Sequence, residues 1–133
     1  IEQHKPIMGI CLGMQLLFEW SEEGECKGLG LIKGKVSKFK NFNEKLNIPQ
    51  MGWNVAEVKK SSNLTDDLFN VNKFYFVHSY HANCIDKEDI LMTTKYGYEF
   101  TSAVQKRNIS GFQFHPEKSH KYGMKIFENF LKI

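Results

Sequence analysis

The stretch that decides the fold is Pro6-Ile7-Met8-Gly9-Ile10-Cys11-Leu12-Gly13-Met14-Gln15. A short apolar run after a proline predicts a buried strand over residues 6–11. The apolar residues that follow, from Met14 onward, predict a helix that ends near Glu23, where Gly24 stops it. Cys11 is therefore expected at a sharp turn from a strand to a helix, with a glycine two positions away on each side.

Such a turn has the arrangement of a nucleophile elbow. Glycines let the chain pass close to itself, and the first N–H groups of a helix supply unpaired donors and a positive potential. Both effects would lower the pKa of the Cys11 thiol and stabilise an oxyanion. The alternative is a cysteine that ends a core strand and only packs there.

A second motif ends another apolar run, Ile109-Ser110-Gly111-Phe112-Gln113-Phe114-His115-Pro116-Glu117. A histidine at a strand end, with a carboxylate two residues on and a proline between them, suits a base held by an acid. His115 would take the Cys11 proton, and Glu117 would fix the imidazole tautomer. A strand-end histidine in a solvated loop is the alternative for this motif alone. The two motifs together favour a cysteine nucleophile served by a His–Glu pair.

The rest of the chain predicts many strands and a closing helix. Strands are expected over residues 28–32, 34–39, 51–58, 74–78, 90–96, 101–105 and 109–114, with a loop over 41–47, a short capped helical turn over 64–69 and an amphipathic helix from Ser119. The continuous apolar run over 74–78 is typical of a central strand. The order of elements predicts a mixed α/β fold with an antiparallel patch in the middle.

Composition indicates a single globular domain over residues 1–133, since 133 residues that are 41% hydrophobic can bury a core without disulfides. The net charge of +3 is too small and too scattered to indicate nucleic-acid binding. No apolar run is long enough to span a membrane, and the first residues lack the apolar core of a signal peptide. We therefore expect a cytoplasmic protein that binds neither nucleic acid nor membrane.

Cysteine and histidine spacing gives no metal or disulfide pattern. The three cysteines form no CxxC pair. His78, His81 and Cys84 follow one another at spacings of three, which alternate faces on a strand and converge poorly on a metal. We expect structural roles for His81 and Cys84, no metal site and no cofactor.

The motifs over residues 9–15 and 115–117 resemble the two signatures of class I, triad-type glutamine amidotransferases. Gln50-Met51-Gly52-Trp53-Asn54, Tyr75-Phe76-Val77-His78-Ser79-Tyr80 and residues 113–119 are similar to the glutaminase subunits (HisH) of imidazole glycerol phosphate synthases. The resemblance runs from Pro6 to the C-terminus. It implies a flavodoxin-like three-layer α/β sandwich with a mixed sheet.

The resemblance also implies a role for each matching residue. Cys11 would form a γ-glutamyl thioester with glutamine, and His115 and Glu117 would complete the triad. The implied remaining roles are an oxyanion N–H at Leu12, a contact to the amino-acid end of glutamine from Gln15, backbone contacts from His78, Ser79 and Tyr80, and a partner face near the ammonia exit at Trp53, Tyr75 and Lys118. As single residues, the last three could equally be ordinary core or surface side chains.

One family element has no match in this sequence. Members carry N-terminal strands and a Pro-Gly-rich loop that supplies a second oxyanion N–H, and nothing here resembles them. We therefore expect these residues to be about the C-terminal two-thirds of a longer one-domain enzyme, with the N-terminal strands missing.

Three hypotheses about function follow. The first is a glutaminase that forms a heterodimer with a (β/α)₈ cyclase subunit (HisF-like) and supplies it with ammonia. The cyclase subunit would then make imidazole glycerol phosphate and AICAR in histidine biosynthesis. The second is a paralogue that supplies ammonia to another acceptor, such as an amidino-sugar pathway. The third is a truncated, non-catalytic subunit that only binds the partner.

Overall fold

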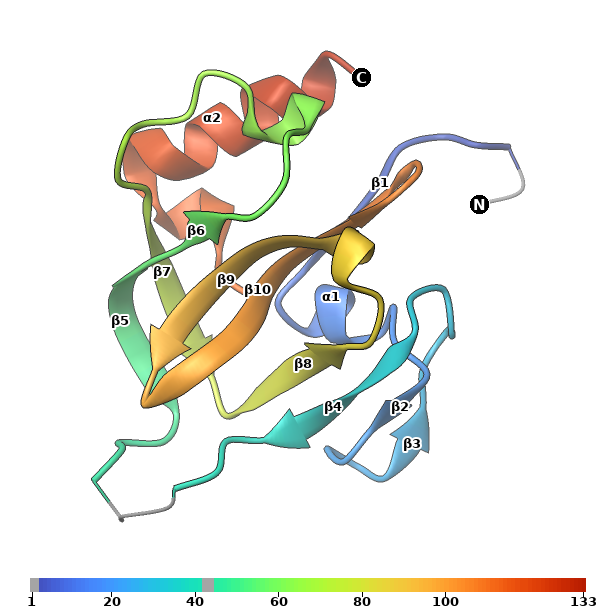
Figure 1. Ribbon diagram of the computed structural model, residues 1–133, viewed down its shortest axis with the longest axis vertical. Coiled ribbons are helices and arrows are strands. Elements are labelled where there is room, and N and C mark those ends of the chain that lie inside the picture. The colour runs from blue at the N-terminus through green and yellow to red at the C-terminus, as the bar shows by residue number, and fades with distance from the viewer. Residues whose placement is uncertain (1–2, 42–44) are drawn as a thin grey trace.

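The structure is a computed structural model that describes residues 3–41 and 45–133 (Figure 1). The strands are β1 (Ile7–Ile10), β2 (Trp20–Ser21), β3 (Cys26–Lys27), β4 (Gly34–Lys38), β5 (Gln50–Val55), β6 (Glu57–Val58), β7 (Lys73–His78), β8 (Tyr80–Cys84), β9 (Ile90–Tyr96), β10 (Tyr98–Lys106) and β11 (Ile109–Phe112). The helices are α1 (Leu12–Gln15) and α2 (His120–Leu131), and the 3₁₀ helices are η1 (Asn63–Thr65), η2 (Lys87–Asp89) and η3 (Pro116–Lys118).

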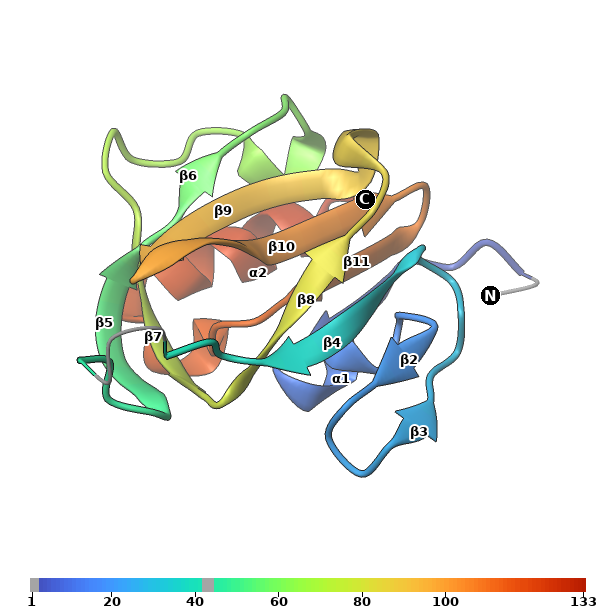
Figure 2. The same cartoon turned by 60° about the horizontal axis from the view of Figure 1, so that its bottom comes forward.

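Most strands belong to one mixed sheet, which Figure 2 shows face on. Its path runs β1-β11-β10-β8-β4-β2-β3, and β9 pairs with β10 and with β6. The β1–β11 and β2–β4 pairs are parallel, whereas the central pairs are antiparallel. The expected mixed sheet with an antiparallel middle is therefore confirmed. Strands β5 and β7 form a separate antiparallel pair at one end of the molecule.

Pairing between β1 and β11 positions the two chemical motifs. The register sets Ile7 opposite Ile109 and Ile10 opposite Phe112. The Cys11 N–H extends the pairing by donating to the Phe112 carbonyl at 2.7 Å. Because the strands are parallel, their carboxyl ends meet at the same edge of the sheet. The residues that follow each strand therefore lie near each other.

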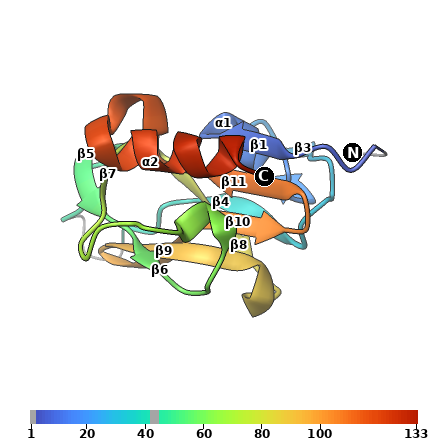
Figure 3. The ribbon, with the colours of Figure 1, turned by 90° about the horizontal axis from the view of Figure 1, so that it is seen from above.

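Both helices lie on one side of the large sheet (Figure 3). Helix α2 turns Gly123, Ile126 and Asn129 inward, as the predicted amphipathic pattern requires. Two apolar clusters fill the space beneath the helices. The cluster near α2 is rich in phenylalanine and includes Phe74, Phe76, Phe100, Phe112, Phe114 and Ile126, and the cluster near α1 includes Met14, Leu17, Phe18, Ile32, Val36 and Val104.

The predicted first helix is wrong in length, because α1 is a single turn and the chain enters β2 at Trp20. The strand expected over 28–32 is also wrong. Those residues fold back as a loop, in which the N–H groups of Leu31 and Ile32 both donate to the Leu17 carbonyl at 2.9 and 3.0 Å. Leu17 is thereby buried by its own following loop rather than by further helix turns.

The prediction for residues 51–58 needs a second correction. The run divides at buried Ala56 into β5 and β6, which belong to different sheets. The expected central strand, β7, pairs with β5 outside the large sheet, and its residues alternate between buried and half-buried. Strand β8 was not predicted. The helical turn expected over 64–69 shortens to η1, although the Ser62 hydroxyl caps it by accepting from the Leu64 N–H.

The remaining predicted elements are confirmed, apart from their ends. Strands β4, β9, β10 and β11 and helix α2 occupy the expected stretches. The loop expected over 41–47 lies partly outside the described residues, and its described residues belong to no helix or strand. None of the described helices is long and apolar enough to cross a membrane.

Candidate active site

Cys11 sits at the predicted turn, in a backbone conformation that non-glycine residues rarely adopt. Its φ is 54° and its ψ is −108°. The Cys11 carbonyl accepts from the Met14 and Gln15 N–H groups at 3.1 and 3.2 Å, so α1 begins immediately after β1 ends. Such strain persists only where the surrounding structure holds it, and it is concentrated at functional sites. The predicted strand–turn–helix arrangement around Cys11 is confirmed.

The two glycines that flank Cys11 differ in what the fold demands of them. A Cβ added to Gly9 would lie 2.5 Å from the Gly13 carbonyl oxygen and 2.9 Å from the Met14 nitrogen. A Cβ on Gly13 would meet no atom of the structure within 4 Å. Close packing of the α1 backbone on β1 therefore requires a glycine only at position 9.

The Cys11 thiol has polar neighbours on several sides. The Leu12 N–H donates to it, and the Gln113 amide nitrogen lies 3.7 Å from Sγ. The Val77 carbonyl is an acceptor for the thiol at 3.9 Å. Burial raises the pKa of the Cys11 thiol, and the donors from Leu12 and Gln113 offset this only in part. The expectation of a lowered thiol pKa is therefore wrong for this structure, because desolvation dominates.

His115 and Glu117 form the expected pair. The His115 Nδ1 lies 2.6 Å from the Glu117 carboxylate, so Nδ1 carries the proton and Nε2 is left as the basic nitrogen. The backbone holds His115 in place, since its N–H donates to the Tyr75 carbonyl at 2.9 Å and its own carbonyl accepts from the Ser119 hydroxyl at 2.6 Å.

Cys11 and the His–Glu pair are near one another but not bonded. They follow the carboxyl ends of the parallel strands β1 and β11. The Glu117 carboxylate acts electrostatically on the thiol and helps to raise its pKa. Among the residues that the structure describes, no hydrogen bond joins the His115 ring to Sγ. Catalytic hydrogen bonds are often long before a substrate binds, so this geometry is compatible with a proton transfer.

A cavity of about 240 Å³ opens at the thiol. Its lining comes from the turn at β1, the segment after α1 and the end of β7, and consists of Cys11, Leu12, Gln15, Glu23, Val77, His78, Ser79 and Tyr80. The structure thus brings together the predicted nucleophile, the predicted oxyanion residue and every predicted substrate-binding residue. Glu23 was missed as a site residue, because the sequence marked it only as the end of a helix.

Both ring nitrogens of His78 are hydrogen-bonded within the protein. Its Nδ1 donates to the Tyr80 carbonyl at 2.7 Å, and its Nε2 accepts from the Gln50 amide at 2.7 Å. Burial, with smaller contributions from the nearby His81 and His115, lowers the pKa of His78 to about 4. His78 is therefore neutral at pH 7 and shapes the cavity wall rather than carrying charge into it.

The predicted partner-facing residues share one surface. Trp53 and Tyr75 are opposite each other in the β5–β7 pair, with ring centroids 6.3 Å apart. Trp53 is 47% exposed and stacks on the His120 ring at 5.5 Å. Lys118 is exposed in η3, two residues before His120. Trp53 and Lys118 are exposed and Tyr75 is half-buried, and Tyr75 pairs with His115, so this aromatic and basic face lies beside the His–Glu pair.

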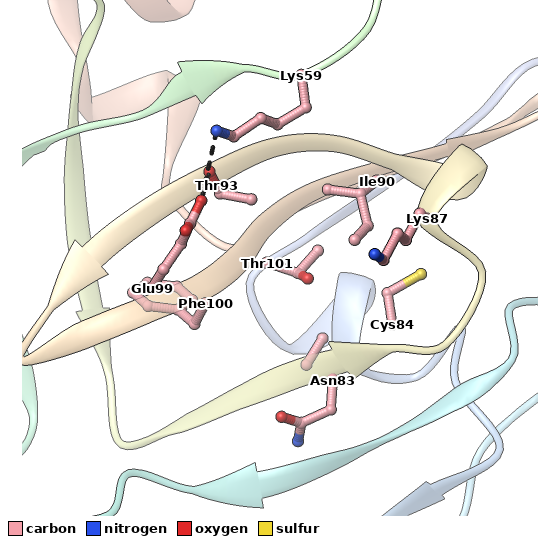
Figure 4. Close-up of a pocket in the computed structure, with 10 residues that line it drawn as sticks. Lys59, Asn83, Cys84, Lys87, Ile90, Thr93, Glu99, Phe100 and Thr101 are labelled. Carbon is pink, nitrogen blue, oxygen red and sulfur yellow. Dashed lines mark hydrogen bonds and ion pairs between the residues drawn. The ribbon is translucent and has the colours of Figure 1, made fainter.

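The other cysteines and histidines lie outside the site. His81 is buried and pairs its Nε2 with the Tyr98 hydroxyl at 2.7 Å. Cys84 lines a separate cavity of about 530 Å³ beside β8, β9 and β10, where Figure 4 shows it near Lys87 while Lys59 reaches Glu99 at the other end. Burial raises the pKa of the Cys84 thiol to about 11. In the described ranges, no three His, Cys, Asp or Glu side chains converge as metal ligands would.

Gln113 is the main residue that sequence reasoning overlooked. It is fully buried and contacts both Cys11 and Gln15. The signal available in the sequence was its place near the end of the strand predicted over 109–114: in an extended chain, Gln113 and His115 are two residues apart and would point to the same side.

The chain belongs to the class I glutamine amidotransferases, because the model of the family "Glutamine amidotransferase class-I" matches residues 1–133. The fold agrees with this membership. A putative GMP synthase protein from Thermoplasma acidophilum superposes with a TM-score of 0.66 at 24% identity, over 96% of this chain and 56% of that one. A glutamine amidotransferase from Thermotoga maritima gives a TM-score of 0.65 at 18% identity, over 98% of this chain and 49% of that one.

Within the family, the chain is most informatively compared with imidazole glycerol phosphate synthase subunits. It is 57% identical to "subunit HisH 2" of Methanococcus maripaludis over 99% of this chain and 65% of that protein. It is 60% identical to the HisH subunit of Sulfurimonas denitrificans over 96% of this chain and 63% of that protein. The chain therefore spans about two-thirds of the length of these relatives, and the match extends the resemblance seen in the motifs.

Proposed function

We propose that the protein containing this chain is the glutaminase subunit of an imidazole glycerol phosphate synthase. It would convert glutamine and water to glutamate and ammonia. The observation that carries the proposal is the position of Cys11, which is held at a strained turn and opens into a cavity lined by Gln15 and by residues 78–80. The identity of 57–60% with HisH subunits supports the assignment within the family.

The proposed reaction has two half-reactions. His115 Nε2 takes the thiol proton as Cys11 Sγ attacks the side-chain amide carbon of glutamine. The C–N bond then breaks, and the imidazolium gives its proton to the departing ammonia. Water, activated by His115, hydrolyses the thioester to glutamate and frees the thiol. Glu117 keeps the proton on Nδ1 throughout and stabilises the imidazolium.

The cavity offers groups for each end of glutamine. The Leu12 N–H, which already donates to Sγ, is the proposed oxyanion donor. Gln15 directs its amide nitrogen to the Tyr80 and Gln113 oxygens, both at 3.0 Å, so its Oε1 is the atom it can offer to the glutamine ammonium. The backbone of His78, Ser79 and Tyr80 would complete the amino-acid end of the site.

The face formed by Trp53, Tyr75 and Lys118 is the proposed docking surface for a (β/α)₈ cyclase subunit. Aromatic side chains such as Trp53 and Tyr75 are enriched at protein interfaces. The position of this face beside His115 suits passage of ammonia from the site of its release to a partner. We place the heterodimer in the cytoplasm, where the Cys11 thiol stays reduced, and its ammonia acceptor in histidine biosynthesis.

Replacing Cys11 with serine tests the proposal in the full protein with its cyclase partner. Glutamine-dependent turnover should disappear, while turnover with added ammonia should continue at the parent rate. Loss of both activities would assign Cys11 a structural role. Growth of a histidine auxotroph on the parent gene, but not on the Cys11→Ser gene, would identify the pathway.

A further inference from the structure

Gln113 bridges the proposed nucleophile and the proposed substrate-binding glutamine. Its amide nitrogen points to Cys11 Sγ at 3.7 Å, and its amide oxygen accepts from Gln15 Nε2 at 3.0 Å. The backbone fixes its place, since the Gln113 N–H donates to the Ser102 carbonyl at 2.8 Å. The side chain is entirely buried. An amide in such a position has one orientation that satisfies both neighbours.

We propose that Gln113 is a positioning residue, whose amide N–H holds the Cys11 thiolate for attack while its amide oxygen sets the orientation of Gln15. This inference rests on the proposed glutaminase function. The arrangement joins two parts of the site that come from different elements, because Cys11 caps α1 and Gln15 is its last residue, whereas Gln113 follows β11.

The thiolate needs such a donor because its other surroundings oppose ionisation. Burial is the largest of these effects, and the Glu117 carboxylate from η3 and the Glu23 carboxylate after α1 add repulsion. The Val77 carbonyl accepts a hydrogen bond from the neutral thiol and cannot donate one to a thiolate. Against these, the Leu12 N–H and the Gln113 amide are the groups that favour the charged form. Hydrogen bonds to an ionised group are roughly twice as strong as those between neutral groups.

The bond to Gln15 gives Gln113 a second effect. A glutamine amide can flip, and the exchange of its oxygen and nitrogen would turn an acceptor toward Sγ. Gln15 prevents the flip, because its N–H requires the Gln113 oxygen on its own side. The orientation of the donor at the nucleophile is thus coupled to the residue proposed to hold the substrate.

The test is the pH dependence of Cys11 alkylation by iodoacetamide in the full protein without glutamine, followed by peptide mass spectrometry. Gln113→Leu and Gln113→Met remove the amide with little change in volume. Each should raise the midpoint of the Cys11 profile by about one pH unit, which is roughly a tenfold slower alkylation at a fixed lower pH. Gln15→Met should move the midpoint in the same direction by less, because it only frees the Gln113 amide to flip.

Gln105→Leu is the matched control. Gln105 is on β10, and its side chain bonds to Ser62 and Asn63 rather than to the site. Its Cys11 profile should match that of the parent. A folded Gln113 variant with the parent midpoint would overturn the proposal, and so would an equal shift in Gln105→Leu.

Steady-state kinetics with glutamine separate the two effects. Gln113→Met should lower kcat through the nucleophile and raise KM through Gln15, whereas Gln105→Leu should change neither. A change in KM alone would contradict a role at the thiolate. If the parent alkylates normally but releases no glutamate, the glutaminase proposal fails while the alkylation series still decides the role of Gln113.

Discussion

Gly9→Ala is expected to be strongly destabilising, because α1 packs its backbone directly on β1 at this position. The new Cβ would lie 2.5 Å from the Gly13 carbonyl oxygen, about 0.9 Å closer than the 3.4 Å at which ordinary van der Waals contact begins. The three nearest atoms are all backbone atoms of Gly13 and Met14, so no side-chain rotation relieves the overlap. Overpacking costs about 1–3 kcal/mol, and we expect about 3 kcal/mol here.

Urea unfolding of the full protein, followed by tryptophan fluorescence, measures this cost. The free energy of unfolding should fall by about 3 kcal/mol with an unchanged denaturant slope. Relief of the clash must also move the turn, so alkylation of Cys11 should change in rate. Gly13→Ala is the matched control and should alter stability by less than about 1 kcal/mol, since its Cβ meets no described atom. Equal costs for the two substitutions, or a neutral Gly9→Ala, would show that α1 does not depend on close backbone packing at position 9.

Three further predictions concern the site and its surroundings. Glu117→Gln should lower the glutaminase kcat by about 10²–10⁴-fold. Glu128→Gln, on the exposed side of α2, is the control and should leave kcat unchanged. Equal activities of the two variants would exclude the proposed role of the Glu117 carboxylate in supporting His115. The pKa of His78 is about 4 in the folded protein, against 6.5 in the unfolded chain. The contribution of this difference to the free energy of unfolding is therefore complete above pH 6.5 and is lost as the pH falls toward 4. That loss amounts to about 3 kcal/mol of unfolding free energy, and His78→Leu should flatten the dependence over this range; an identical slope in the variant would contradict it. Trp53→Ala should weaken binding to the cyclase partner by about 30-fold in calorimetry, whereas Trp20→Ala, at a similarly exposed tryptophan outside the proposed face, should not; equal losses would place the interface elsewhere.

The sequence predicted the parts of the fold that local pattern controls. Apolar alternation and glycine placement located β4, β9, β10, β11 and α2, and the strand–turn–helix at Cys11 followed from a short apolar run between glycines. The parallel pairing of β1 with β11 could not be predicted, since partner choice depends on contacts between residues about 100 positions apart. The same limit explains β7, whose apolar run is the same whether its neighbour is a central strand or β5.

The site divides in the same way. Cys11, His115 and Glu117 could be named from residue types and spacing, because the geometry of each turn is local. The length of α1 could not, because Leu17 and Phe18 satisfy a helical pattern while being buried by the returning loop at residues 28–32. The raised pKa of the Cys11 thiol depends on its burial in the folded protein and on the Glu117 carboxylate about 100 positions away, which no local pattern reports.

Labelling with a glutamine analogue that carries a reactive carbon asks whether Cys11 is the nucleophile that attacks glutamine. The analogue, incubated with the full protein and its partner, should add one equivalent at Cys11, and excess glutamine should slow the addition. Exposed Cys26 and half-buried Cys84 are built-in controls and should remain unmodified. We expect glutamine-protected labelling of Cys11, and modification of Cys26 or Cys84 in its place would contradict the assignment of the nucleophile.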